Sequence, residues 1–244
     1  MNKKHIFISP HHDDVCFSLA TTISKNNNSH ILNLFTRSNF TSQASHGSLN
    51  SDQIIESVSK IRDLEDESFA EKLALGRTNF SLVDASVKRN NPFDLFEIQN
   101  EVNDISSQIL PELVKMLNQS KGDNYIYCPM GVGRHRNHLS TLISILDNFN
   151  DIQSRSKVFF YEELPYSSIK DSKIEAVNRL KKAFPNNQLI RHVSMLSGSQ
   201  FEKKMQLISI YKSQLSTTIQ CNSFIPYDDF ITLPHEAYWE VIIN

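Results

Sequence analysis

Apolar and polar positions alternate along the chain in the manner of parallel α/β proteins. Residues 6–8 form a short β-branched and aromatic run, which predicts a strand that is buried on both faces and closed by Pro10. Residues 14–24 are dense in apolar side chains, which predicts a buried helix, and residues 30–35 predict a second buried strand. The opening is therefore expected to be a βαβ unit with parallel strands and a right-handed crossover.

The rest of the chain continues this alternation. A long amphipathic helix is expected over residues 53–75, with Gly76 as its C-cap, followed by a strand over 80–83 that ends at Asp84. Further expected elements are a helix over 92–117 that is interrupted or restarted at Pro111, strands over 125–128 and 157–160, helices over 139–146, 172–183 and 200–215, and a C-terminal strand over 233–241. No repeat, coiled coil or linker breaks this order, so residues 1–244 are expected to form one α/β domain.

Composition narrows the functional classes. The 25 Lys and Arg residues nearly balance the 27 Asp and Glu residues, so the chain lacks the positive charge expected of a protein that binds nucleic acid or an anionic membrane. The longest apolar runs are too short for a signal peptide or a membrane span, and we expect a soluble, cytoplasmic protein. Three widely spaced cysteines argue against a disulfide framework and a cysteine zinc cluster, and six glycines argue against a glycine-rich phosphate loop.

The first expected strand leads directly into two histidines and two aspartates, His11, His12, Asp13 and Asp14. Open α/β sheets bind ligands at the carboxyl ends of their strands, and four ionisable groups crowded there are costly without a cation or substrate. On a turn that enters a helix, His11 and Asp14 can face one metal ion and leave Asp13 beside it as a base. The alternative, that the aspartates only stabilise the helix N-terminus by about 0.3–1 kcal/mol, does not explain the histidines.

A second pair of histidines follows the strand expected over residues 125–128. Asn137 is a suitable N-cap for the next helix, which would place His135 in the loop and His138 in the first helical turn. The alternative is a pair of solvated histidines in a basic loop. Because both clusters follow strands of one parallel sheet, we expect them to project from the same edge.

Together the clusters provide a His/Asp/His set, which with one solvent molecule is the shell expected of a catalytic zinc site. Asp13 and His135 would then flank the bound water. Iron(II) fits the same ligands, since imidazole and carboxylate do not strongly select zinc.

Several motifs occur in a characteristic order along most of the chain: Ser9-Pro10-His11-His12-Asp13-Asp14, Arg62 with Glu65, Leu75-Gly76, Asp84, Gly133-Arg134-His135-Arg136-Asn137-His138, Tyr161-Glu162-Glu163-Leu164-Pro165-Tyr166, Tyr211-Lys212-Ser213-Gln214 and Tyr238-Trp239. This series resembles the PIG-L/LmbE-like family of zinc-dependent N-acetylglucosaminyl deacetylases. The first and fourth motifs are specific in combination, whereas each of the others is weak alone.

The resemblance implies a fold and a set of roles. The implied fold is a Rossmann-like three-layer α/β sandwich with a mostly parallel central sheet. The implied cofactor is zinc, or iron(II), held by His11, Asp14 and His138. Asp13 would be the general base, and His135 would polarise the carbonyl and stabilise the oxyanion. Arg62 and Asp84 fall where the family contacts sugar hydroxyls, whereas the default interpretation of Arg62 with Glu65 is a surface ion pair.

Three positions depart from the family pattern. Val15 stands where many members have a glutamate, and His12 replaces the usual proline or leucine, which makes it a spectator or a surplus ligand. Asn137 replaces a frequent aspartate. If that aspartate raises the pKa of the neighbouring histidine, the neutral amide leaves His135 less readily protonated.

The expected activity is removal of the acetyl group from an N-acetylated sugar or sugar-containing metabolite, which releases acetate and a free amine. The same metal centre fits a hydrolase of another small-molecule amide or acyl group. A catalytically silent carbohydrate-binding protein is the alternative from a different class, whereas a DHH-type phosphoesterase is disfavoured because its spaced metal-binding carboxylates are missing. The expected partner is a small molecule, without nucleic acid or membrane, and a homo-oligomer stays open.

Overall fold

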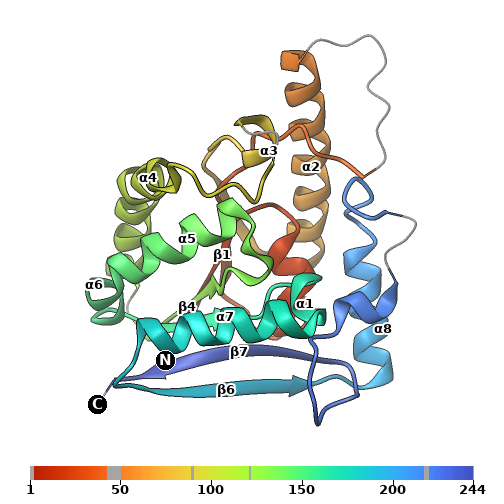
Figure 1. Cartoon of the computed structure of the whole chain (residues 1–244). Coiled ribbons are helices and arrows are strands. Elements are labelled where there is room, and N and C mark those ends of the chain that lie inside the picture. Colours follow the sequence, from red (N-terminus) through yellow and green to blue (C-terminus); the bar gives the residue numbers. More distant parts are fainter. Residues whose placement is uncertain (1–2, 43–50, 89–90, 121, 217–219, 244) are drawn as a thin grey trace.

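The computed structural model describes residues 3–42, 51–88, 91–120, 122–216 and 220–243 (Figure 1). All three cysteines are free, and among the described residues no helix is long and apolar enough to cross a membrane. The elements follow in the order β1 (Lys4–Ser9), α1 (Asp14–Ser24), β2 (Ser29–Asn33), α2 (Ser51–Leu73), β3 (Gly76–Asn79), α3 (Ala85–Lys88), α4 (Ile98–Gln119), β4 (Asn124–Pro129), η1 (Val132–Arg134), α5 (Arg136–Asp147), α6 (Phe149–Gln153), β5 (Lys157–Tyr161), η2 (Tyr166–Ser168), α7 (Lys170–Ala183), β6 (Gln188–Met195), α8 (Gly198–Ile208), η3 (Cys221–Phe224) and β7 (His235–Ile242).

Seven strands form one sheet in the order β3-β2-β1-β4-β5-β7-β6. The strands from β3 to β5 are parallel, whereas β7 runs antiparallel to both β5 and β6. The predicted mostly parallel α/β sheet is therefore confirmed. The edge strand β6 was not expected, because most of its residues are only half-buried and form no continuous apolar run.

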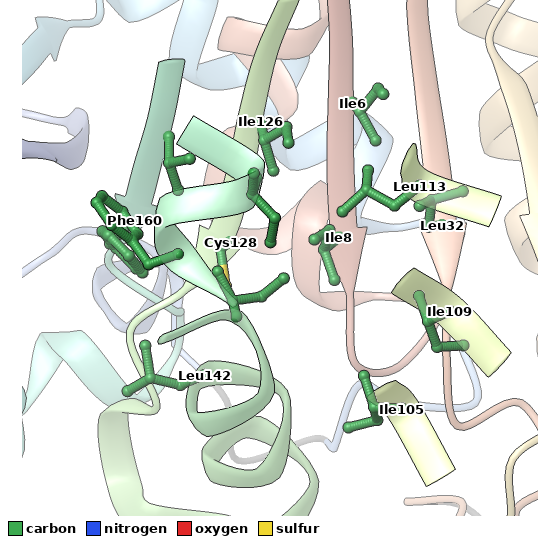
Figure 2. Packing of buried hydrophobic residues seen from close by; sticks show 14 of the residues in the cluster. Ile6, Ile8, Leu32, Ile105, Ile109, Leu113, Ile126, Cys128, Leu142 and Phe160 are labelled. Carbon is green, nitrogen blue, oxygen red and sulfur yellow. The ribbon is translucent and has the colours of Figure 1, made fainter. Parts of the chain in front are cut away.

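Alternate residues of the central strands point to opposite faces of the sheet and build two separate cores. On one face, Ile6 and Ile8 of β1 join a core that includes residues of α4, α5, α6 and α7. Figure 2 shows part of this core, in which α4 and α5 place the side chains Ile105, Ile109, Leu113 and Leu142 against the strands. On the other face, Phe7 packs with residues of α1, α2 and α8. The three layers that the resemblance implies are confirmed.

Helix α1 has an internal break at Leu19, whose φ of −132° and ψ of 23° lie outside the helical region. The buried carboxylate of Glu236 on β7 accepts hydrogen bonds from the backbone N–H of Thr21 at 2.9 Å and of Thr22 at 2.8 Å. It thereby caps the second half of the helix. The buried Lys204 of α8 pairs with Glu236 at 3.2 Å. This network fixes α1, with the aspartates at its N-terminal end, against β7 and α8 (Figure 1).

The third strand lies earlier than the sequence predicted. It occupies Gly76–Asn79, and residues 80–83 contribute only an isolated bridge. Gly76 is therefore not a C-cap, and the residue that adopts the left-handed conformation after α2 is Ala74, with a φ of 52°. Glycine is favoured at position 76 for a different reason, because a Cβ there would lie 2.3 Å from the ring of His30 and would displace that side chain.

Two helix boundaries were also predicted wrongly. The helix expected from residue 92 begins at Ile98, after the left-handed Glu97, and then continues through Pro111. Asn91 and Asp94 each accept, at Oδ1, a backbone N–H two residues later, at 3.0 and 2.9 Å, and these local turns compete with the helix. The helix expected over residues 200–215 ends at Ile208.

Candidate metal centre

The two histidine clusters predicted from the sequence meet at one edge of the sheet. His11 follows β1, and His138 lies near the start of α5, after the adjacent parallel strand β4. The Nδ1 atom of His11 lies 3.3 Å from the Nε2 atom of His138. The Oδ2 atom of Asp14 lies 3.3 Å from the first of these nitrogens and 3.4 Å from the second. These three atoms belong to buried residues and form a nearly equilateral triangle. Because each can donate an electron pair to a metal ion, we call them the donor atoms.

This triangle has the dimensions of a tetrahedral zinc shell. Zinc binds imidazole nitrogen at about 2.0–2.1 Å and carboxylate oxygen at about 2.0–2.2 Å, so two ligands of a tetrahedral ion lie roughly 3.3–3.5 Å apart. The three separations of 3.3, 3.3 and 3.4 Å agree with that requirement. The residues present therefore fit a zinc ion without rearrangement.

His135 lies beside these atoms, and its ring is nearly perpendicular to that of His11, with an angle of 88° between the two ring planes. It offers a nitrogen within 4.8 Å of nitrogens of His11 and His138, so a set of three histidines is also available to a metal. Two observations favour Asp14 as the third ligand. The oxygen of Asp14 is within 3.4 Å of both nitrogens, and the Nδ1 atom of His135 accepts a hydrogen bond from the backbone N–H of Asn137 at 3.3 Å. An accepting Nδ1 leaves the proton of a neutral ring on Nε2, which is then a donor.

The electrostatic environment favours positive charge among the donor atoms. Burial opposes protonation of His11, but the carboxylates of Asp84 and Asp14 outweigh it and raise the pKa of His11 to about 10. Burial would raise the pKa of Asp84, yet His11 and the nearby Arg62 hold it well below its usual value. The pKa of His135 is lowered well below its usual value by burial and by the other two histidines. His135 is thus a neutral ring beside a site that attracts a cation.

Asp13 lines the same pocket as His11 and Asp14. It is the N-cap residue of α1, but its side chain makes no capping hydrogen bond. Instead, its Oδ1 atom accepts a hydrogen bond from the NH2 group of Arg62 at 3.0 Å. Burial raises the pKa of Asp13, and Arg62 opposes that shift. The alternative that this aspartate only stabilises the helix N-terminus is therefore not supported.

Arg62 is buried and belongs to the pocket, so the alternative of a surface ion pair with Glu65 is wrong. The NH1 group of Arg62 donates to the Oγ atom of Ser38 at 3.0 Å and lies 3.8 Å from the Oδ2 atom of Asp84. Glu65 instead accepts hydrogen bonds from the backbone N–H and the hydroxyl of Ser213, at 2.8 and 2.6 Å. Arg62 and Asp84 both line the pocket, and their contact with a sugar hydroxyl stays a prediction.

Asn137 does not cap α5, contrary to the sequence prediction. The N-cap is His135, and the side chain of Asn137 points into the site. Its Nδ2 atom donates to the Oδ1 atom of Asp84 at 3.0 Å and lies 3.0 Å from the Nε2 atom of His11. The substitution of the family's frequent aspartate by asparagine therefore changes the surroundings of His11 and Asp84 more directly than those of the His135 ring.

The other two departures lie away from the donor atoms. Neither ring nitrogen of the buried His12 has a hydrogen-bond partner among the residues that the structure describes, and the nearest carboxylate among them, that of Asp63, is 3.9 Å away. Burial and the positive charge of Arg62 lower the pKa of His12 to about 3. His12 does not line the pocket, which favours a spectator role over that of a surplus ligand. Val15 belongs to α1 and is fully buried in the core between this helix and the sheet, where an apolar side chain fits.

The pocket that adjoins the donor atoms has a volume of about 300 Å³, at the lower end of the range for small-molecule sites. The loop that we expected to shape it, residues 39–51, contributes Phe40, and residues 43–50 lie outside the described part of the chain. Polar groups come from His11, Asp13, Asp14, Arg62, Asp84, Ser86, His135 and Gln214, and apolar walls from Phe40, Pro92, Phe93, Leu164, Pro165 and Tyr166.

The sequence did not reveal the role of Arg136, which stands in one of the family motifs and was given no function there. This side chain is fully buried, and two of its nitrogens donate to one oxygen of Glu101, at 2.8 and 2.6 Å. Its NH1 group donates to the carbonyls of residues 94 and 96, at 2.7 and 2.6 Å, and its backbone N–H donates to the carbonyl of residue 92. Arg136 thus holds this segment against the site, where the ring of Phe93 meets that of His135 edge-on at 5.8 Å.

A family model described as PIG-L: GlcNAc-PI de-N-acetylase matches residues 6–146. This span is more than half of the chain and contains every residue that was predicted to hold the metal, to act in catalysis or to bind the substrate. No curated protein matches the chain significantly.

Several solved structures share the fold. The zinc-inhibited form of teicoplanin deacetylase Orf2 is 16% identical, with a TM-score of 0.68 and coverage of 98% of both chains. The A40926 pseudoaglycone deacetylase Dbv21 is 16% identical, with a TM-score of 0.67 and coverage of 99% of this chain and 98% of that one. The N,N'-diacetylchitobiose deacetylase from Pyrococcus horikoshii is 14% identical, with a TM-score of 0.50 and coverage of 88% and 72%. At these identities the likeness establishes the fold.

Proposed function

Because this chain belongs to the PIG-L family of de-N-acetylases, we propose that it is a zinc-dependent hydrolase that removes the acetyl group from an N-acetylated sugar or sugar-containing metabolite. The observation that carries the proposal is the triangle of donor atoms from His11, Asp14 and His138, with sides of 3.3–3.4 Å. Iron(II) is the alternative occupant, since the same donor types also accept it.

The proposed catalytic roles of Asp13, Arg62 and His135 follow from their contacts in the pocket. When bound, zinc supplies Lewis acidity and lowers the pKa of a water ligand to about 7. Asp13, oriented by Arg62, is the base that takes the proton of the attacking water. His135 presents its Nε2–H as a fixed donor to the negative charge that develops on the acetamide oxygen.

The leaving amine needs a proton, and Asp13 returns the one that it has taken. His135 is less suited to this step, because its lowered pKa keeps the ring neutral. We therefore assign His135 the role of a neutral hydrogen-bond donor.

The size and lining of the pocket support a small N-acetylated substrate. A volume of about 300 Å³ suits a single sugar ring with its acetamide, with polar groups at the donor atoms and aromatic side chains on the walls. Structural relatives are named as deacetylases of teicoplanin and of N,N'-diacetylchitobiose. Arg62 and Asp84 are the proposed contacts for sugar hydroxyls.

The experiment that tests the function combines elemental analysis of the purified protein with measurement of primary-amine release from a panel of N-acetyl sugars. One zinc or iron ion per chain, with amine release that a chelator abolishes and added zinc restores, is the expected result. Amine release from simple amides but not from N-acetyl sugars would instead indicate a different amidohydrolase. A protein that binds no metal and releases no amine after addition of zinc would favour the silent carbohydrate-binding alternative.

A further inference from the structure

The carboxylate of Glu163 lies directly behind the candidate ligand His138. Glu163 follows β5 and is fully buried. Its Oε1 atom lies 3.3 Å from the Nδ1 atom of His138, the ring nitrogen on the far side from Asp14 and His11. The roles that the family resemblance implies do not include this contact.

The position of the Glu163 carboxylate is fixed by the backbone. It accepts hydrogen bonds from the N–H groups of Met130 at 2.9 Å, Gly131 at 2.6 Å and Val132 at 3.2 Å. These residues connect the end of β4 to η1, and the guanidinium of Arg179 donates to the carbonyl of Gly131 in the same segment at 3.0 Å. The carboxylate is therefore held in place before any ligand binds.

The neighbouring Glu162 is equally buried but has different partners. Its carboxylate pairs with Arg191 at 2.7 Å and with Lys173 at 3.0 Å, and it accepts a hydrogen bond from the indole of Trp239 at 2.9 Å. Among the described residues, the only ion-pair contact of Glu163 is with His138. Glu162 is thus neutralised by two cations away from the site, whereas Glu163 directs its charge at His138.

We propose that Glu163 is a positioning residue that fixes His138 in the orientation and tautomer required of a metal ligand. An ionised carboxylate only accepts hydrogen bonds, so the proton of the His138 ring stays on Nδ1. The lone pair of Nε2 is then available to the metal. At His11 the two nitrogens are exchanged: Nδ1 faces the donor atoms, whereas Nε2 lies 3.5 Å from the carboxylate of Asp84 and 3.0 Å from the amide nitrogen of Asn137. This inference rests on the proposed metal site.

The test compares Glu163→Gln with the matched variant Glu162→Gln. Each metal-free protein is titrated with zinc in competition with a chromophoric chelator. A glutamine at 163 cannot accept from both the ring and the three backbone N–H groups, so Glu163→Gln is expected to weaken zinc binding by about 10- to 100-fold. Glu162→Gln is expected to keep the affinity of the wild type while lowering the melting temperature, because it disturbs the pair with Arg191 and Lys173.

A second measurement needs no variant. In a long-range proton–nitrogen NMR spectrum of the zinc-loaded wild type, His138 is expected to show a slowly exchanging proton on Nδ1. The proposal is overturned if that ring carries its proton on Nε2, if Glu163→Gln binds zinc as tightly as the wild type, or if Glu162→Gln weakens zinc binding equally. Failure of the wild type itself to bind zinc would instead refute the proposed metal site.

Discussion

The guanidinium of Arg62 on α2 donates to the carboxylate of Asp13 at the start of α1, with a distance of 3.0 Å between NH2 and Oδ1. The same guanidinium donates to the hydroxyl of Ser38 at 3.0 Å, and its side chain is only 3% exposed. A planar fork with several donors is needed to make both contacts. Arg62 therefore orients the proposed base in addition to any contact with substrate.

Arg62→Lys separates these two roles. A lysine keeps the charge but cannot make both hydrogen bonds, so Asp13 loses its orientation and kcat is expected to fall by about tenfold or more. Zinc affinity should be unchanged. Steady-state kinetics check this, and a rise in KM with an unchanged kcat would show that Arg62 only binds the sugar. Arg77→Lys, in the partly exposed pair with Asp63, is the control.

Asp13→Ala and His138→Ala distinguish the base from a ligand. Without its base, the enzyme is expected to lose about 10²–10⁴-fold in turnover while its zinc affinity stays near that of the wild type. Loss of the His138 imidazole removes one of the three donor atoms and is expected to lower zinc affinity sharply. The measurements are kcat with saturating zinc and the dissociation constant for zinc. Equal loss of zinc from both variants would contradict the assigned roles.

The sequence was sufficient to predict that His11, Asp14, His135 and His138 gather at one sheet edge. Both histidine clusters follow buried strands, and parallel strands end on the same side, so local patterns determine this part of the site. The contact between Arg62 and Asp13 could not be predicted in the same way. It depends on how far α2 packs toward α1, which helical periodicity does not specify.

The fold shows the same difference between features that local sequence patterns determine and features that depend on tertiary packing. Buried central strands such as β1 and β4 produce continuous apolar runs, whereas the half-buried edge strand β6 does not and was missed. Gly76 was interpreted as a helix cap because glycine is the usual left-handed residue, but Ala74 adopts that conformation here. In the sequence, Glu163 is only one of two adjacent glutamates. The orientation of its carboxylate depends on tertiary hydrogen bonds with the backbone of residues 130–132.

Phe93→Ala tests whether the aromatic wall contributes to substrate binding. The side chain is 49% exposed, yet Arg136 holds its segment in place, so the ring is preorganised at the pocket. An aromatic contact contributes about 0.5–1.5 kcal/mol, which predicts a roughly two- to tenfold rise in KM with little change in kcat. Phe230→Ala, at a side chain that is 94% exposed and outside the pocket, is the control. An unchanged KM would exclude Phe93 from the binding surface.

Asp66 predicts a pH-dependent contribution to stability. Burial raises the pKa of this carboxyl to about 6, although Tyr211, Asn33 and Arg77 oppose the shift. A pKa that is higher in the folded state means that folding favours the protonated form, so the contribution of Asp66 to stability is greatest below about pH 4 and is lost as the pH rises through 6.

The measurement for Asp66 is the free energy of unfolding of the wild type and of Asp66→Asn, determined by urea denaturation between pH 4 and 7. The wild type is expected to lose up to about 3 kcal/mol relative to the variant as the pH rises from 4 to 7. Subtracting the variant removes the contributions of other titrating groups. A difference that does not change with pH would show that Asp66 titrates normally in the folded protein.

The buried pair of Lys204 and Glu236 predicts a large stability effect at a distance from the pocket. Both side chains are fully buried, and Glu236 also caps the second half of α1 through Thr21 and Thr22. Lys204→Met leaves the carboxylate buried without its cation, which is expected to lower the free energy of unfolding by about 3–5 kcal/mol. Lys115→Met removes a pair with Glu112 in which the two side chains are 60% and 37% exposed. This change should lower the free energy of unfolding by less than about 1 kcal/mol.

Adding Glu236→Gln to Lys204→Met shows where this effect originates. If the cost arises from the unpaired buried charge, the neutral amide removes it while its oxygen still accepts from a backbone N–H of α1, so the double variant should be more stable than Lys204→Met alone. Urea denaturation of the wild type, Lys204→Met, Lys115→Met and the double variant measures these differences in the free energy of unfolding. Equal losses from Lys204→Met and Lys115→Met would mean that the pair contributes no more than a surface contact, and the capping of α1 by Glu236 would then have to stabilise the helix without Lys204.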